Sequence, residues 1–167
     1  MPSTIAGHAG RALIVTVSDR LFHGEEDDGI GALVTELLVE AGFAVDGIVV
    51  VPSDSVMVRN ALNTAVIGGV DLVITTGGTG VSARDVVPDV TSEVLDRELD
   101  GVAQAIRWSG TTAGVLEAVV SRGVVGVSGS TLVANIAGSR AAIRDGLATF
   151  CPLARYLIGE LSTFQEI

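Results

Sequence analysis

Three continuous apolar runs constrain the fold of this chain more than any other feature of its sequence. They span residues 11–18, 43–51 and 71–76. Runs of this kind, without alternation of polar and apolar residues, are typical of strands buried on both faces of a parallel sheet. Residues 30–41 and 53–67, which separate them, place apolar residues at helical spacing. The order βαβαβ predicts a doubly wound α/β fold, with a mostly parallel sheet and helices on both faces.

The segments around these repeated units are less regular. Residues 19–29 are polar and contain a run of acids, so we expect an exposed loop there. Residues 88–97 and 102–109 predict two short helices, and Pro88 suits the first position of the earlier one.

The last part of the chain predicts two short strands and two helices. The strands are expected at 124–128 and 132–136, as a small β-hairpin or as two sheet strands, because a turn-rich gap separates them. Ser139 is expected to cap a helix over 140–150. Pro152 is expected to begin a separate last helix that ends near residue 161.

The length and composition indicate one domain with an aliphatic core. A chain of 167 residues can bury a sizeable core without disulfides or a structural metal. Only 4% of the residues are aromatic, whereas 48% are hydrophobic. We expect residues 1–10 to be a flexible tail and residues 11–167 to form a single α/β domain.

The charge of the chain limits its partners. The net charge is −10, and all ten basic residues are Arg. Such a chain repels the phosphates of nucleic acids, so we expect no nucleic-acid partner. Without Lys, an anionic ligand must be held by backbone N–H groups, Arg side chains or a metal.

The remaining composition favours a cytoplasmic protein. Cys151 is the only cysteine, which fits a reducing compartment. Residues 1–11 do not resemble a signal peptide, and the apolar runs are too short to span a membrane. The high mean hydropathy, +0.56, favours burial of apolar surface between subunits.

A Gly-rich loop follows the third apolar run directly. Thr76 ends that run and Gly77, Gly78, Thr79 and Gly80 follow it, where ligands of open α/β sheets bind. Glycines let successive N–H groups face one anion, and Thr76 and Thr79 add hydroxyls. The segment is neither a P-loop nor a dinucleotide fingerprint, because it has neither Lys nor the required glycine spacing. A tight turn without a ligand is the alternative interpretation.

The residues after this loop favour a binding site over a simple turn. Ser82, Arg84 and Asp85 follow within five residues of Gly80. A carboxylate beside bound phosphates is typical of a Mg²⁺ ligand. Asp85 could equally cap the next turn or pair with Arg84, and the sequence leaves these interpretations open.

At this point the sequence resembles the MogA/MoaB family of molybdopterin proteins. The motif TTGGTG is present at 75–80, and the pattern S-x-R-D-V-x-P-D-x-T follows at 82–91. The SDR motif lies at 18–20, SRG at 121–123, and G-x-T-L-V-x-N-x-x-G-S at 129–139. The resemblance covers roughly residues 11–160.

The resemblance implies an activity, its ligands and an assembly. Active members adenylylate molybdopterin with Mg-ATP and release pyrophosphate, and they assemble as homotrimers or hexamers. The implied metal-associated and catalytic carboxylate is Asp85. The residues implied to bind the ligand are Ser18, Thr76, Gly77, Gly78, Thr79, Gly80, Ser82, Asn135, Gly138 and Ser139.

The chain departs from the family pattern at a position tied to catalysis. Ser53 stands where adenylylating members carry the first Asp of a Pro-Asp-Asp/Glu segment, and Ser is a weaker ligand for a hard cation. Ala137 replaces a frequent Pro, while Asn135 and Gly138 remain. The alternative is therefore a paralogue with little or no activity that carries molybdopterin or binds other cofactor-biosynthesis proteins. A weaker alternative is an unrelated nucleotide-binding α/β enzyme.

Overall fold

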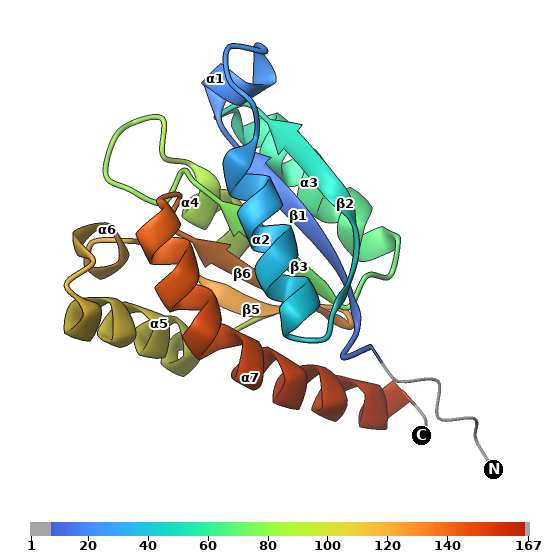
Figure 1. The fold of residues 1–167 in the computed structure, drawn as a ribbon. Coiled ribbons are helices and arrows are strands. Elements are labelled where there is room, and N and C mark those ends of the chain that lie inside the picture. The colour runs from blue at the N-terminus through green and yellow to red at the C-terminus, as the bar shows by residue number, and fades with distance from the viewer. Residues whose placement is uncertain (1–7, 166–167) are drawn as a thin grey trace.

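A computed structural model describes residues 8–165, which form one mixed sheet covered by helices on both faces (Figure 1). The sheet order is β2-β1-β3-β6-β5-β4, and β2, β1, β3 and β6 run parallel. The hairpin strand β5 is antiparallel to β6 and to the edge strand β4. The strand bounds are Arg11–Val17 (β1), Ala44–Val51 (β2), Leu72–Thr76 (β3), Arg97–Glu98 (β4), Val125–Ser128 (β5) and Thr131–Ile136 (β6).

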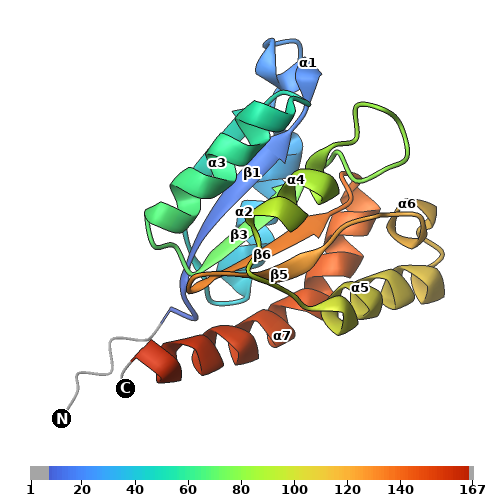
Figure 2. The same cartoon turned by 180° about the vertical axis from the view of Figure 1, so that it is seen from behind.

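The helices divide between the two faces of the sheet. α2 and α7 cover one face, with α5 packed beside α7, while α3 and α4 cover the other (Figure 2). This confirms the predicted doubly wound α/β fold. The helix bounds are Asp19–Phe22 (α1), Gly29–Glu40 (α2), Ser55–Ile67 (α3), Val87–Val94 (α4), Asp100–Ala113 (α5), Leu116–Val119 (α6) and Arg140–Gln165 (α7).

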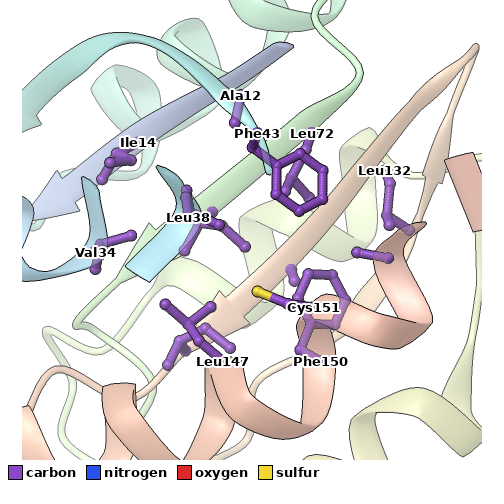
Figure 3. Close-up of a cluster of buried hydrophobic side chains, with 14 of the residues drawn as sticks. Ala12, Ile14, Val34, Leu38, Phe43, Leu72, Leu132, Leu147, Phe150 and Cys151 are labelled. Carbon is purple, nitrogen blue, oxygen red and sulfur yellow. The ribbon is translucent and has the colours of Figure 1, made fainter. Parts of the chain in front are cut away.

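Each face of the sheet buries its own apolar layer. The layer under α2, α5 and α7 holds the large side chains Leu38, Phe43 and Phe150, which lie close together in Figure 3. The layer under α3 and α4 is mostly Val. Because both faces are buried, the central strands must be apolar along their whole length, and this explains the continuous apolar runs.

The second half of the chain follows the prediction only in part. The two expected helices correspond to α4 and to a longer α5, and the expected strands form the hairpin β5–β6. The expected exposed loop at 19–29 contains the single-turn helix α1, which Ser18 caps. The short elements β4 and α6 were not predicted, because they have too few residues for a periodic pattern.

The prediction of two final helices was wrong, since α7 runs unbroken through Pro152. Proline removes one helical hydrogen bond and bends the helix, and Figure 1 shows that α7 changes direction along its length. The carbonyl that loses its partner belongs to Ala148, an exposed residue, so water can satisfy it. Burial of Phe150, Cys151 and Ala154 on the two sides of Pro152 keeps the helix in place.

The predicted tail, residues 1–10, lies mostly outside the described residues. Within them, the amide of Ala9 donates to the carbonyl of Gly42 at 2.8 Å, and Ala9 packs against the core. No helix in the described part of the chain is both long and apolar enough to cross a membrane.

Phe150 anchors the kinked helix in the larger core layer and is fully buried. Phe150→Ala should lower the free energy of unfolding by about 3–5 kcal/mol, because it leaves a cavity. The exposed Tyr156 on the same helix gives the control, since Tyr156→Ala should change stability by less than about 0.5 kcal/mol. Urea denaturation measures both, and equal effects would contradict this account of α7.

Candidate functional site

The carboxyl ends of β1, β3 and β6 meet at one edge of the sheet. In the parallel register, Thr76 lies between Thr16 on β1 and Ile136 on β6. The segments that follow these three strands therefore begin next to one another. The Gly77 amide donates to the carbonyl of Ile136 at 3.1 Å, which joins the Gly-rich loop to the segment after β6.

Close backbone approach requires glycine in this loop. Gly77 and Gly78 have φ values of +87° and +66°, a left-handed conformation that other residues rarely adopt. A Cβ on Gly77 would lie 2.6 Å from the carbonyl oxygen of Val17. A Cβ on Gly138 would lie 3.2 Å from Gly77 Cα. The main chains of three strand ends therefore pack directly against one another.

A surface hollow of about 390 Å³ opens beside this backbone junction. Four of its ten lining residues are glycines, so main chain without a side chain borders part of it, while Asp85 and Glu117 contribute side chains. The N-terminus of α7 lies at the same place, and its dipole favours an anion. The lining residues are Gly77, Gly78, Thr79, Gly80, Asp85, Glu117, Val120, Ala137, Gly138 and Ser139.

Asp85 closes the loop that follows Gly80. Its Oδ2 accepts hydrogen bonds from the Ser82 amide at 2.9 Å and from the Ser82 hydroxyl at 2.8 Å. Burial opposes its ionisation, but the bonds from Ser82 and the Gly80 amide, with the charge of Arg122, lower the pKa of the Asp85 carboxyl. Asp85 is therefore a carboxylate at neutral pH. Turn capping and a ligand-facing position are both compatible with this geometry, whereas the suggested pairing with Arg84 is wrong, because Arg84 pairs with Asp19.

Arg122 holds the same loop through hydrogen bonds to three of its carbonyls. Its side chain donates to the carbonyls of Gly80 at 2.8 Å and Asp85 at 2.7 Å, and its amide donates to the carbonyl of Thr79 at 2.9 Å. It also pairs with Asp89 at 3.3 Å. Arg122 thus shapes the rim of the hollow, and its guanidinium is already used by protein oxygens.

The structure brings some predicted site residues to the hollow and places others elsewhere. Ser139 lines it while its hydroxyl accepts from the Ala142 amide at 3.1 Å, so it is also the cap of α7. Ser82 supports Asp85 from outside the lining. Ser18 caps α1, where its hydroxyl accepts from the Leu21 amide at 3.3 Å.

Asn135 serves the interior of the protein and lies outside the lining of the hollow. Its amide nitrogen donates to the hydroxyls of Thr75 at 2.9 Å and Thr91 at 3.0 Å, and its oxygen accepts from the Val124 amide. The side chain is 4% exposed. These bonds tie β6 to β3, α4 and the start of β5, which is a structural use of this residue.

Thr76 is also buried rather than part of the lining. It is 1% exposed, and its hydroxyl has no hydrogen-bond partner among the described residues. A buried hydroxyl without a partner is unfavourable, so this oxygen is free for a group that the chain itself does not supply.

Ser53 lies at the end of β2, beside a second ionised carboxylate. Its amide donates to Asp19 Oδ1 at 2.9 Å, and Arg84 pairs with Asp19 Oδ2 at 2.7 Å. The Ser53 amide and the Arg84 guanidinium lower the pKa of Asp19. The neighbouring Asp54 caps α3 by accepting from the Met57 amide at 3.0 Å, so its carboxylate is used locally.

Three residues that line the hollow, Glu117, Val120 and Ala137, were not predicted as site residues. Glu117 and Val120 line it from α6 and the residue after α6. The sequence carries no periodic signal for such a short helix, so its position depends on tertiary packing. Within residues 8–165, no group of three or more His, Cys, Asp or Glu side chains forms a metal cluster.

Comparison with known proteins identifies relatives over most of the chain. Residues 13–156 match the family described as probable molybdopterin binding domain. The chain is 32% identical over 145 residues to the molybdopterin adenylyltransferase of Pyrococcus furiosus, with 80% of each protein covered. It is 32% identical over 151 residues to a molybdenum cofactor biosynthesis bifunctional protein of Chlorobaculum tepidum. There the match covers 90% of this chain but only 48% of that longer protein.

Solved structures give the same result. A molybdopterin biosynthesis protein from Mycobacterium abscessus is 62% identical, with a TM-score of 0.92 and coverage of 94% of this chain and 99% of that one. A structure of MogA is 40% identical, with a TM-score of 0.85 and coverage of 90% and 99%. The predicted resemblance to the MogA/MoaB family is confirmed.

The close backbone junction predicts which glycine tolerates a side chain. Gly77→Ala should destabilise the protein by about 2 kcal/mol or more, because the new Cβ meets a carbonyl and the φ value is strained. Gly101 on α5 has open space around it, so Gly101→Ala should be neutral or slightly stabilising. Thermal unfolding compares the two, and equal melting temperatures would contradict this role of Gly77.

Proposed function

The chain belongs to the family of probable molybdopterin binding domains, and from this premise we propose that it adenylylates molybdopterin in molybdenum cofactor biosynthesis. The observation that carries the proposal is the hollow at Gly77–Gly80, where an ionised Asp85 lies beside left-handed glycines. The name of the Pyrococcus furiosus relative supports adenylyl transfer over a carrier function.

The proposed reaction transfers AMP from ATP to a phosphate. An oxygen of the terminal phosphate of molybdopterin bonds to the α-phosphorus of ATP, and the bond from that phosphorus to the bridging oxygen breaks, which releases pyrophosphate. A phosphate nucleophile is already anionic, so no strong base is required. The protein must instead align the two phosphates and offset their charges.

The hollow suits the phosphate of molybdopterin. Gly77, Gly78 and Gly80 carry no Cβ, so a phosphate in the hollow can come close to their backbone. The N-terminus of α7 lies at the same place. Backbone amides and the helix dipole carry partial positive charge. Phosphate binding here therefore does not require Lys, which the chain lacks. We therefore assign Gly77–Gly80, Gly138 and Ser139 to phosphate binding.

The donor set at Asp85 fits Mg²⁺. This ion takes one or two protein carboxylates and completes its shell with phosphate oxygens and water. Asp85 provides one carboxylate that its surroundings keep ionised. When bound, the metal would neutralise charge on the phosphates of ATP, and Asp85 would hold it at the rim of the hollow.

We also propose that the chain assembles as a homotrimer or hexamer, as the resemblance implies. Trp108 on α5 and Leu116 on α6 are 74% and 79% exposed. Large apolar side chains in such positions favour coverage by another subunit. Sedimentation velocity distinguishes a trimer, a hexamer and a monomer.

The proposed activity predicts a requirement for the Asp85 carboxylate. With molybdopterin and Mg-ATP, the protein should release pyrophosphate, and Asp85→Asn should slow this release by about 100-fold or more. Asp54→Asn is the matched control and should retain activity within twofold, because Asn caps a helix about as well as Asp. Tight binding of molybdopterin without pyrophosphate release would instead identify a carrier or regulatory paralogue.

Substitution of Ser53 tests whether the absence of a carboxylate at this position limits adenylyl transfer. Ser53→Asp should raise the rate of pyrophosphate release about tenfold if turnover is weak, because it adds a hard oxygen ligand beside Asp19 and the loop that carries Asp85. Ser53→Asn, neutral and of similar size to Asp, is the control. An unchanged rate in a weakly active protein would show that the missing carboxylate is not the reason for the weakness.

A further inference from the structure

Glu117 is a carboxylate without a partner in a hollow that otherwise suits an anion. It lines the hollow from α6, it is exposed, and within residues 8–165 its side chain forms neither an ion pair nor a hydrogen bond. Asp85, the other acid of the lining, is held by Ser82. A free negative charge opposes the binding of a phosphate nearby. Phosphate binding in the hollow therefore does not account for Glu117.

Packing of α6 holds Glu117 in this position. The neighbouring Ala118 is 4% exposed and is buried in a cluster with Ala142 of the first turn of α7. A Cβ on Gly110 of α5 would overlap the Cβ of Ala118, so the close approach of α6 to α5 depends on glycine. Figures 1 and 2 both show α6 beside the N-terminal end of α7. The main chain that carries Glu117 is therefore fixed by two helices.

Aliphatic side chains accompany this carboxylate in the lining. Val120, the residue after α6, lines the hollow and is 60% exposed, and Ala137 lines it as well. The hollow therefore combines glycine backbone for a phosphate with aliphatic surface and a free carboxylate. Aliphatic surface suits an uncharged ring, and a carboxylate suits N–H donors on the edge of that ring. The volume of about 390 Å³ lies within the range of small-molecule pockets, about 300–1,000 Å³.

We propose that Glu117 determines the specificity of the hollow, by accepting two hydrogen bonds from the aminopyrimidinone edge of a pterin whose phosphate lies at the Gly-rich loop. This edge carries two adjacent N–H groups, which match the two oxygens of a carboxylate. The same charge repels phosphates that bring no such donors, so it disfavours competing ligands. The identification of the ring as the pterin of molybdopterin rests on the proposed function. The free carboxylate beside aliphatic side chains rests on the geometry.

Anaerobic calorimetric titration with molybdopterin, in EDTA and at constant ionic strength, tests this assignment. Glu117→Gln should weaken binding about tenfold or more, the loss expected for a charge-assisted hydrogen bond. Glu36→Gln makes the same charge change at an exposed glutamate of α2 that does not line the hollow. It should change binding less than about twofold. Equal effects of the two variants, or no measurable binding to the unaltered protein, would overturn the proposal.

Methyl phosphate separates recognition of the ring from a general effect of charge. It has no ring, so it should bind Glu117→Gln as tightly as the unaltered protein or more tightly, because a repelling charge is absent. Glu117→Asp keeps the charge but shortens the side chain. It should weaken molybdopterin binding severalfold without changing the binding of methyl phosphate. Equal weakening of both ligands by Glu117→Gln would contradict recognition of the ring.

Two other ligands also match a free carboxylate, and the same titrations distinguish them. A loss in Glu117→Gln that appears only when Mg²⁺ replaces EDTA would identify a metal ligand and would overturn the proposal. GMP carries the same aminopyrimidinone edge together with a phosphate. Tighter binding of GMP than of molybdopterin would assign the site to a guanine nucleotide and would overturn the identification of a pterin.

The assay for pyrophosphate release separates this inference from the proposed function. Molybdopterin binding that depends on Glu117, without any release of pyrophosphate from Mg-ATP, would contradict only adenylyl transfer. Pyrophosphate release with the same KM for molybdopterin in Glu117→Gln and in the unaltered protein would contradict only the role of Glu117.

Discussion

The site depends on a contact between two main chains, where Gly77 passes the carbonyl of Val17. β1, β3 and β6 are parallel and in register, so they end at the same level. The segments that follow them therefore pack closely together. Only residues without a Cβ fit there, since a Cβ on Gly77 would lie 2.6 Å from the Val17 oxygen. Four of the residues that line the resulting hollow, Gly77, Gly78, Gly80 and Gly138, carry no side chain, so their main chain borders it directly.

The glycine-rich lining of the hollow fits the unusual charge balance of the chain. The net charge is −10 and there is no Lys, so few free cations are available to attract an anion. Arg122 and Arg107 are bound to main-chain carbonyls, and Arg84 is paired with Asp19. Backbone amides of the Gly-rich loop and the N-terminus of α7 are therefore the groups that can attract an anion at this site. Arg140 is exposed and forms no ion pair within residues 8–165.

The fold was predictable from the sequence where burial of strands and helices imposes a regular pattern of apolar residues. Central strands such as Leu72–Thr76 are buried on both faces, and they appear as apolar runs. The continuity of α7 was not predictable, because it depends on packing of Phe150 and Ala154 on both sides of Pro152. Local sequence signals a break at proline but does not reveal the tertiary contacts that outweigh it.

The candidate site was predictable at its backbone and less so at its side chains. The glycines and Asp85 could be located because a strand leads directly into them. The direction of Asn135 was not evident, because the register of β6 against β3 decides which face it occupies, and there it bonds Thr75 and Thr91. Glu117 reaches the hollow only through the packing of α6, for which a four-residue helix carries no sequence signal.

The loop that carries Asp85 is held independently of the side chain at position 53. Arg122 holds it through the carbonyls of Gly80 and Asp85, and Arg84 connects it to Asp19. Position 53 contributes only its amide, which donates to Asp19 and which almost any residue could supply. Ser in place of the Asp that the family resemblance implies therefore changes the charge without removing a support. The shape of the hollow and the charge beside it are thus separate properties of this chain, and one can change while the other persists.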